Sequence, residues 1–173
     1  MPTQINGLPA HVLIVHAVVV LVPLAALVLV LASVWPTFRR RAGIAVPLLA
    51  LVALICVPFA TEAGEWLEAR VPGSELVQKH TQLGGTLLPW VIGLFVVSAV
   101  TWLLAWWTER NRSGADAGPR RSTGLLVVRI VVAVVAVAVA VGTVAQVYRI
   151  GESGSRAAWH GRVDQTVGQY DTD

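Results

Sequence analysis

The side chains that could do chemistry in this chain are four histidines, and all four fall on one side of its predicted membrane-spanning segments. Imidazole groups can ligate a metal ion or a haem iron, or carry protons near neutral pH. The sequence holds no phosphate-binding glycine loop and no nucleophile elbow, and its one cysteine lies inside a predicted helix. We therefore predict no catalytic residue and favour a binding role over enzymatic activity. The candidate residues are His11, His16, His80 and His160.

The composition is that of an integral membrane protein. Hydrophobic residues make up 55% of the 173 residues and charged residues only 13%, whereas soluble domains carry about 25% charged residues. Four apolar stretches are each long enough to cross a hydrocarbon core of about 30 Å. We therefore predict an all-α fold, a four-helix up-down bundle forming a single transmembrane domain over residues 1–173. Its helices are expected at about 8–35, 42–67, 75–107 and 124–148, followed by a tail at 149–173.

The arginines predict the orientation of this bundle. Arg39–Arg41 follow the first helix, and four more arginines surround the connection between the third and fourth helices. Short arginine-rich loops are typically cytoplasmic, so both termini are expected outside a bacterial inner (plasma) membrane. The formal charge of +3 then arises from arginines in short cytoplasmic loops and not from a nucleic-acid-binding surface. No nucleic-acid partner is therefore expected. The expected partners are the lipid bilayer and either other membrane subunits or further copies of the chain.

Counting residues upward from the arginine side estimates the depth of each histidine. At about 1.5 Å of rise per residue, His11, His80 and Glu65 reach similar heights above the outer hydrocarbon boundary, and His16 lies below them. Ser74 is a suitable N-cap for a helix that carries His80 outward. In a square bundle the first and third helices are diagonal, so a ligand between them could be held by one histidine from each.

Three site chemistries remain open at this stage. A b-type haem used for electron transfer needs two axial imidazoles, which His80 can supply together with either His11 or His16. A zinc or copper ion needs three or four converging ligands, and the suitable side chains are His11, His16, His80, His160 and Glu65. A proton relay needs only titratable groups near the boundary, such as His16, Glu62 and Glu65.

The simpler alternative is that the histidines are solvated. His11 and His16 are about 140° apart around a helix, so they do not share a face. The Ala/Val-rich helix faces would then pack against a larger membrane complex, of which this protein would be a non-catalytic accessory subunit.

Four short motifs resemble those of a known family of bacterial four-helix membrane proteins, the domain of unknown function twenty-two thirty-one. They are Pro9-Ala10-His11 with His16, Thr61-x3-Glu65-Trp66, Lys79-His80-x3-Gly84, and Tyr148-Arg149-Ile150-Gly151 with Gly154 and Trp159. The resemblance spans Gly7 to about Gly161. The family's first helix often reads His-Pro-x3-His-Phe-Pro, and in this chain Val12 and Ala17 replace the Pro and the Phe.

The architecture is also similar to that of di-haem cytochrome b membrane proteins, which hold haem between histidines of a four-helix bundle. This resemblance implies that His80 is one axial ligand and that His11 or His16 is the other. Those proteins usually carry histidine pairs on both sides of the membrane, whereas no histidine of this sequence lies near the arginine-rich side. The resemblance therefore implies at most one haem b, on the outer side.

Overall fold

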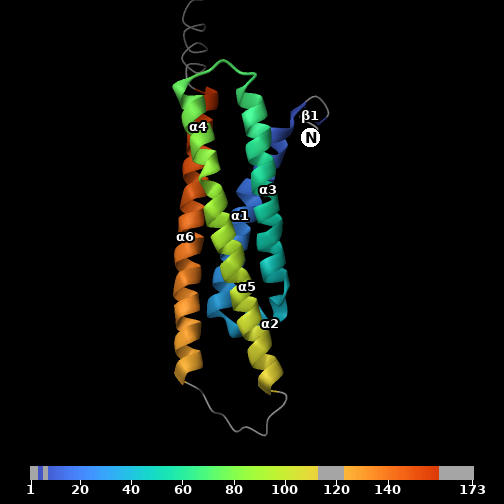
Figure 1. The fold of residues 1–173 in the computed structure, drawn as a ribbon, viewed down its shortest axis with the longest axis vertical. Coiled ribbons are helices and arrows are strands. Elements are labelled where there is room, and N and C mark those ends of the chain that lie inside the picture. Colours follow the sequence, from blue (N-terminus) through green and yellow to red (C-terminus); the bar gives the residue numbers. More distant parts are fainter. Residues whose placement is uncertain (1–3, 6–7, 113–122, 160–173) are drawn as a thin grey trace, which may run out of the picture.

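The fold is a long bundle of helices, seen in a computed structural model that describes residues 4–5, 8–112 and 123–159 (Figure 1). Its helices are α1 (Ala10–Val34), α2 (Pro36–Ala42), α3 (Ala45–Glu68), α4 (Glu75–Gly85), α5 (Leu87–Arg112) and α6 (Thr123–Trp159). Before α1, the two-residue strand β1 (Gln4–Ile5) pairs antiparallel with β2 (Leu8–Pro9). Four segments are long and apolar enough to cross a membrane: His11–Val34, Ala45–Glu68, Glu75–Asn111 and Thr123–Trp159. The predicted all-α, four-span architecture is confirmed.

The four long helices stand at the corners of a square. α1 packs mainly against α3 and α6, and α5 packs mainly against the same two helices, so α1 and α5 are diagonal. The short helix α2 lies at one end of the bundle, and α4 extends α5 toward the other end (Figure 1). We call these the arginine end, after Arg39–Arg41 on α2, and the histidine end, after His11 and His80.

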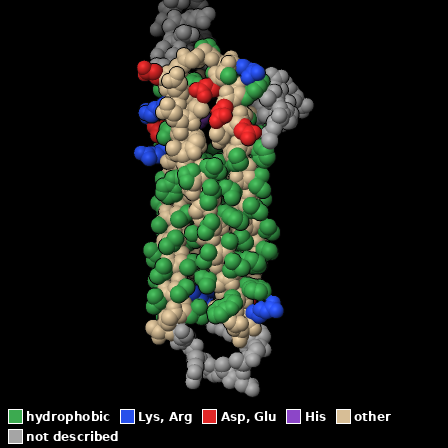
Figure 2. Space-filling view, viewed as in Figure 1, with side chains coloured by type: hydrophobic (Ala, Val, Ile, Leu, Met, Phe, Trp, Pro, Cys, Tyr) green, Lys and Arg blue, Asp and Glu red, His purple; other side chains and the backbone are tan. Residues whose placement is uncertain are grey.

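Small side chains let the helices approach closely. Seven alanines of the bundle interior are at most 5% exposed: Ala25, Ala26, Ala32, Ala50, Ala53, Ala136 and Ala140. Backbones separated by such small residues gain dispersion contacts that larger side chains would prevent. Buried hydroxyl groups bond within their own helices, as when Ser98 Oγ donates to the Leu94 carbonyl at 2.7 Å. Many other valines and leucines are exposed, and on the face shown in Figure 2 hydrophobic side chains form a band between charged side chains at the two ends.

The third predicted helix, 75–107, is interrupted at Thr86 and divides into α4 and α5. Pro89 has no backbone N–H, and its ring clashes with the carbonyl four residues earlier, that of Gly85. The chain turns tightly there, since Thr86 N donates to the Leu83 carbonyl at 3.1 Å. Gln146 of α6 donates a side-chain hydrogen bond to Thr86 Oγ1, which ties the break to the neighbouring helix.

The fourth helix is longer than predicted, because α6 continues past Tyr148 to Trp159. Residues 149–159 were expected to begin the tail that follows the fourth helix. They remain helical because α4 packs against this part of the bundle and because Glu152 and Arg156 form an ion pair at 2.6 Å, one turn apart. The expected tail at 160–173 lies outside the described residues.

Candidate functional site

His11 lies in the first turn of α1 and points toward α3. Its Nδ1 atom is 2.9 Å from the carbonyl oxygen of Ala60. A carbonyl only accepts hydrogen bonds, so Nδ1 carries the proton and donates it. In the neutral ring, Nε2 then keeps a free lone pair. The ring lies against Gly64, where an added Cβ would be 3.1 Å from both Cε1 and Nδ1.

His80 lies in the middle of α4 and points toward α6. Its Nδ1 atom is 3.0 Å from the Ser153 hydroxyl, and that hydroxyl donates its own proton to the Ile150 carbonyl at 2.8 Å. Ser153 therefore accepts the bond to His80, so Nδ1 is again the protonated atom and Nε2 again keeps its lone pair. The ring lies against Gly154, where an added Cβ would be 2.9 Å from Cε1.

The two imidazoles meet at one cavity at the histidine end. Their ring centres are 6.4 Å apart, and their planes are inclined by 78°. Both rings line a cavity of about 60 Å³. Its other walls are mostly apolar and include Val18, Val57, Gly84, Leu87 and Val147. The arrangement can thus present two neutral nitrogen ligands, from different helices, to one apolar space.

His16 and Glu65 are not brought to this cavity. His16 is exposed, and its Nδ1 donates to the carbonyl of Val12 in its own helix. Glu65 is exposed on the last turns of α3. His160 lies outside the described residues, so its predicted participation stays a prediction. Within residues 4–5, 8–112 and 123–159, no three His, Cys, Asp or Glu side chains gather closely enough to hold a metal ion.

The sequence did not predict which residues orient the two rings, although Gly154 belongs to one of the family motifs. Gly64 and Gly154 provide the space for the rings, and Ser153 fixes the tautomer of His80. Ser153 and Gly154 fall in the segment that was expected to be a tail. If the fourth helix had been predicted to continue beyond Tyr148, Ser153 and Gly154 would have been expected at the same height as His80. Gly84, which the sequence places in one motif with His80, does line the cavity.

Comparison with known proteins identifies one family. No curated protein and no solved structure matches the chain. One family model matches residues 7–167, and its description is "Predicted membrane protein (DUF2231)". That match includes both histidines of the cavity, the glycines beside them and all four membrane-spanning segments. The chain therefore belongs to the DUF2231 family of predicted membrane proteins.

Proposed function

We propose that this protein binds one b-type haem between His11 and His80 and uses it for electron transfer. The observation that carries the proposal is the pair of imidazoles at one apolar cavity, each with its Nδ1–H held by an acceptor of the protein. Histidines that ligate a metal almost always donate their other ring N–H in this way, which fixes the ring and raises its basicity. When bound, the haem would supply a one-electron redox couple.

The position of the two rings supports their sharing one ligand. Their centres are 6.4 Å apart and their planes are inclined by 78°, and both rings line the same cavity. One metal-containing group bound in a widened cavity could therefore be held by both imidazoles.

The number of protein ligands supports haem over a bare zinc ion. A porphyrin supplies four nitrogens itself, so two histidines complete the coordination of its iron. Zinc sites need three or four protein ligands, and the described part of the chain offers only two at this cavity. The apolar walls also suit a macrocycle, which needs hydrophobic surfaces on both of its faces.

The cavity must widen before it can hold a porphyrin. Its volume of about 60 Å³ has room for a few water molecules, whereas ligand pockets span about 300–1,000 Å³. The chain offers a place for this change, since α4 is separated from α5 at Thr86 and has glycines at its last two positions. A displacement of α4 together with the last turns of α6, to which His80 is bonded through Ser153, would move His80 and the cavity wall at Gly84 as one unit. We infer that haem binding proceeds with such a displacement.

We further infer that the histidine end faces the outside of a bacterial inner membrane. Six described arginines lie at the opposite end, on α2, at the end of α5 and at the start of α6 (Arg39, Arg40, Arg41, Arg110, Arg112 and Arg129). This distribution is the one expected when the arginine end is cytoplasmic. Both chain ends would then be outside, and the haem would lie near the outer surface.

Expression with ample haem precursor, followed by purification in detergent, tests the haem proposal. We expect reduced-minus-oxidised spectra of a six-coordinate b-type haem, with loss of that spectrum in His11→Ala and in His80→Ala. His16→Ala is the matched control, since it removes a histidine of the same helix that does not line the cavity, and it should keep the spectrum. Absence of haem after reconstitution with hemin would refute the proposal. Co-purification of other membrane subunits without any cofactor would favour the accessory-subunit alternative.

A further inference from the structure

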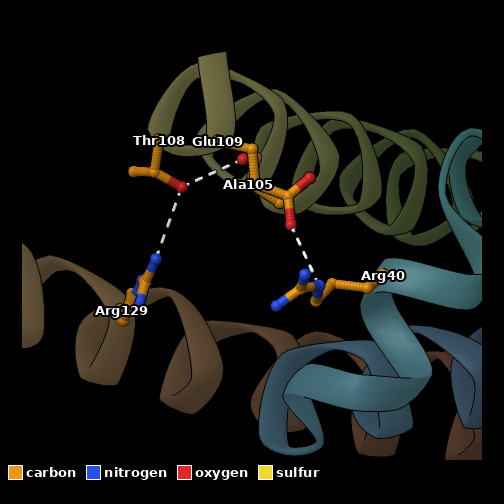
Figure 3. Close-up of polar contacts among 5 residues, drawn as sticks. All are labelled: Arg40, Ala105, Thr108, Glu109 and Arg129. Atoms are coloured by element: carbon orange, nitrogen blue, oxygen red, sulfur yellow. Dashed lines mark hydrogen bonds and ion pairs between the residues drawn. The ribbon is translucent and has the colours of Figure 1, made fainter. Parts of the chain in front are cut away.

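The arginine end of the bundle brings two guanidinium groups to one pocket. Arg39 comes from α2 and Arg129 from the second turn of α6, far apart in sequence. Both line a small pocket among α1, α5 and α6, which also includes Ser33, Thr101 and Leu104. Figure 3 shows the neighbouring polar contacts of Arg129 and of Arg40 at this end. Two like charges at one pocket repel one another unless an anion lies between them.

The guanidinium group of Arg39 is half-buried and has few hydrogen bonds. Its Nη1 donates to the Ala32 carbonyl at 3.4 Å, a long bond. Its buried Nε–H has no hydrogen-bond partner within the described residues. Burial lowers the pKa of Arg39, and the charge of Arg129 lowers it further, while the carboxylate of Glu109 acts in the opposite direction. The guanidinium therefore loses hydration without gaining equivalent protein contacts.

Arg129 is bonded only weakly. Its Nη2 donates to the Thr108 hydroxyl at 3.4 Å, and that hydroxyl donates to the Ala105 carbonyl at 2.9 Å (Figure 3). The nearby acid, Glu109, forms an ion pair with Arg40 at 3.2 Å, so its charge is shared with a third arginine. The charge of Glu109 is therefore not reserved for the two arginines that line the pocket.

The hydroxyl groups of the pocket are already engaged as hydrogen-bond donors elsewhere. The hydroxyls of Ser33 and Thr101 donate to the carbonyls of Leu29 and Val97, each at 2.8 Å. Their protons are therefore engaged within their own helices. The N–H groups of the two arginines are the donors left to meet a negatively charged oxygen.

We propose that this pocket binds the phosphate group of an anionic phospholipid, with Arg39 and Arg129 as its cationic ligands. Guanidinium groups match phosphate oxygens with paired, charge-assisted hydrogen bonds. The pocket volume of about 20 Å³ admits about one oxygen-sized group, so one phosphate oxygen enters and the rest of the group stays at the mouth. Ser33 of this pocket belongs to the last turn of α1 and Arg129 to the second turn of α6, so the pocket lies near the ends of the membrane-spanning helices, the level at which lipid headgroups begin. That level favours a lipid over soluble phosphate.

Lipid binding to the detergent-solubilised full chain tests the site, measured by native mass spectrometry. The probes are dioleoyl phosphatidic acid and, as the zwitterionic comparison, dioleoyl phosphatidylcholine. We expect wild type to prefer phosphatidic acid, and Arg39→Gln and Arg129→Gln each to weaken its binding about tenfold or more, as expected for a lost charged hydrogen bond. Arg41→Gln is the matched control, since it removes an exposed arginine of the same short helix, and we expect a change below about threefold.

Two further arms complete the test. Millimolar inorganic phosphate distinguishes the source of the anion: an arginine-dependent rise in melting temperature with phosphate alone would support a soluble phosphate ligand and overturn the lipid assignment. Arg39→Lys keeps the positive charge but loses the planar guanidinium group with its paired N–H donors. We therefore expect this variant to fold and to bind phosphatidic acid more weakly than wild type. Equal losses in Arg39→Gln and Arg41→Gln would show diffuse attraction to the arginine end and would overturn the site. Equal binding of phosphatidylcholine would also overturn it.

Discussion

Gly154→Ala should displace the His80 ring and weaken haem binding while leaving the bundle folded. The added Cβ would be 2.9 Å from His80 Cε1 and 3.2 Å from Nδ1, where ordinary contacts begin at 3.4 Å. The ring must shift by about half an ångström to restore van der Waals contact. Such a shift strains the 3.0 Å bond to Ser153. Loss of an orienting partner of a metal ligand typically costs 10- to 100-fold in affinity, and we expect a fall in haem affinity of that size.

Gly151→Ala is the matched control for this substitution. Gly151 lies one turn earlier on α6, and an added Cβ there meets nothing within 4 Å. In both variants alanine favours the helix over glycine by about 0.5–1 kcal/mol, so a difference between them reports the contact with His80. The assay is titration of the purified, haem-depleted proteins with hemin, alongside thermal melts. Equal haem affinity of Gly154→Ala, Gly151→Ala and wild type would refute the reasoning.

Three further predictions concern other contacts of the bundle. Ser153→Ala removes the acceptor that orients His80, so we expect haem affinity to fall about 10-fold or more with little change in melting temperature; unchanged affinity would contradict this role. Gly142→Ala places a Cβ 2.0 Å from Cζ3 of Trp90 and should destabilise the protein by about 1–3 kcal/mol despite the gain in helix propensity, as thermal melts would show; an unaltered or higher melting temperature would refute the overpacking. Glu109→Gln breaks the ion pair with Arg40, whose two side chains are 71% (Arg40) and 53% (Glu109) exposed. The free energy of unfolding from thermal melts should therefore fall by less than about 1 kcal/mol, and a larger loss would mean that Glu109 has a structural role.

The number and type of the helices could be predicted because a bilayer leaves few alternatives. Backbone polar groups in hydrocarbon must bond within the chain, and an apolar stretch of about 20 residues in a helix fulfils that requirement. The helix ends could not be predicted as well, because they depend on tertiary packing. Hydropathy falls at Tyr148, yet α6 continues to Trp159 beside α4. Similarly, Pro89 interrupts the third segment at Thr86, a break that periodicity alone does not reveal.

The histidine pair was partly visible in the sequence. Depth counting placed His11 and His80 at one height, and the structure brings their ring centres to 6.4 Å. The helical rotation places His16 about 140° around the helix from His11, and His16 is indeed exposed. The roles of Gly64 on α3 and Gly154 on α6, which make room for the rings, became apparent only when the packing of those helices was known.

The coordination state of the ferric haem tests the central claim most directly, and electron paramagnetic resonance of the hemin-reconstituted protein measures it. For wild type we predict one low-spin, six-coordinate haem per chain. For His11→Ala and His80→Ala we predict high-spin haem or none, and for His16→Ala the wild-type signal. A wild-type protein that takes up no haem, or a low-spin signal that survives both cavity variants and disappears in His16→Ala, would contradict ligation by His11 and His80.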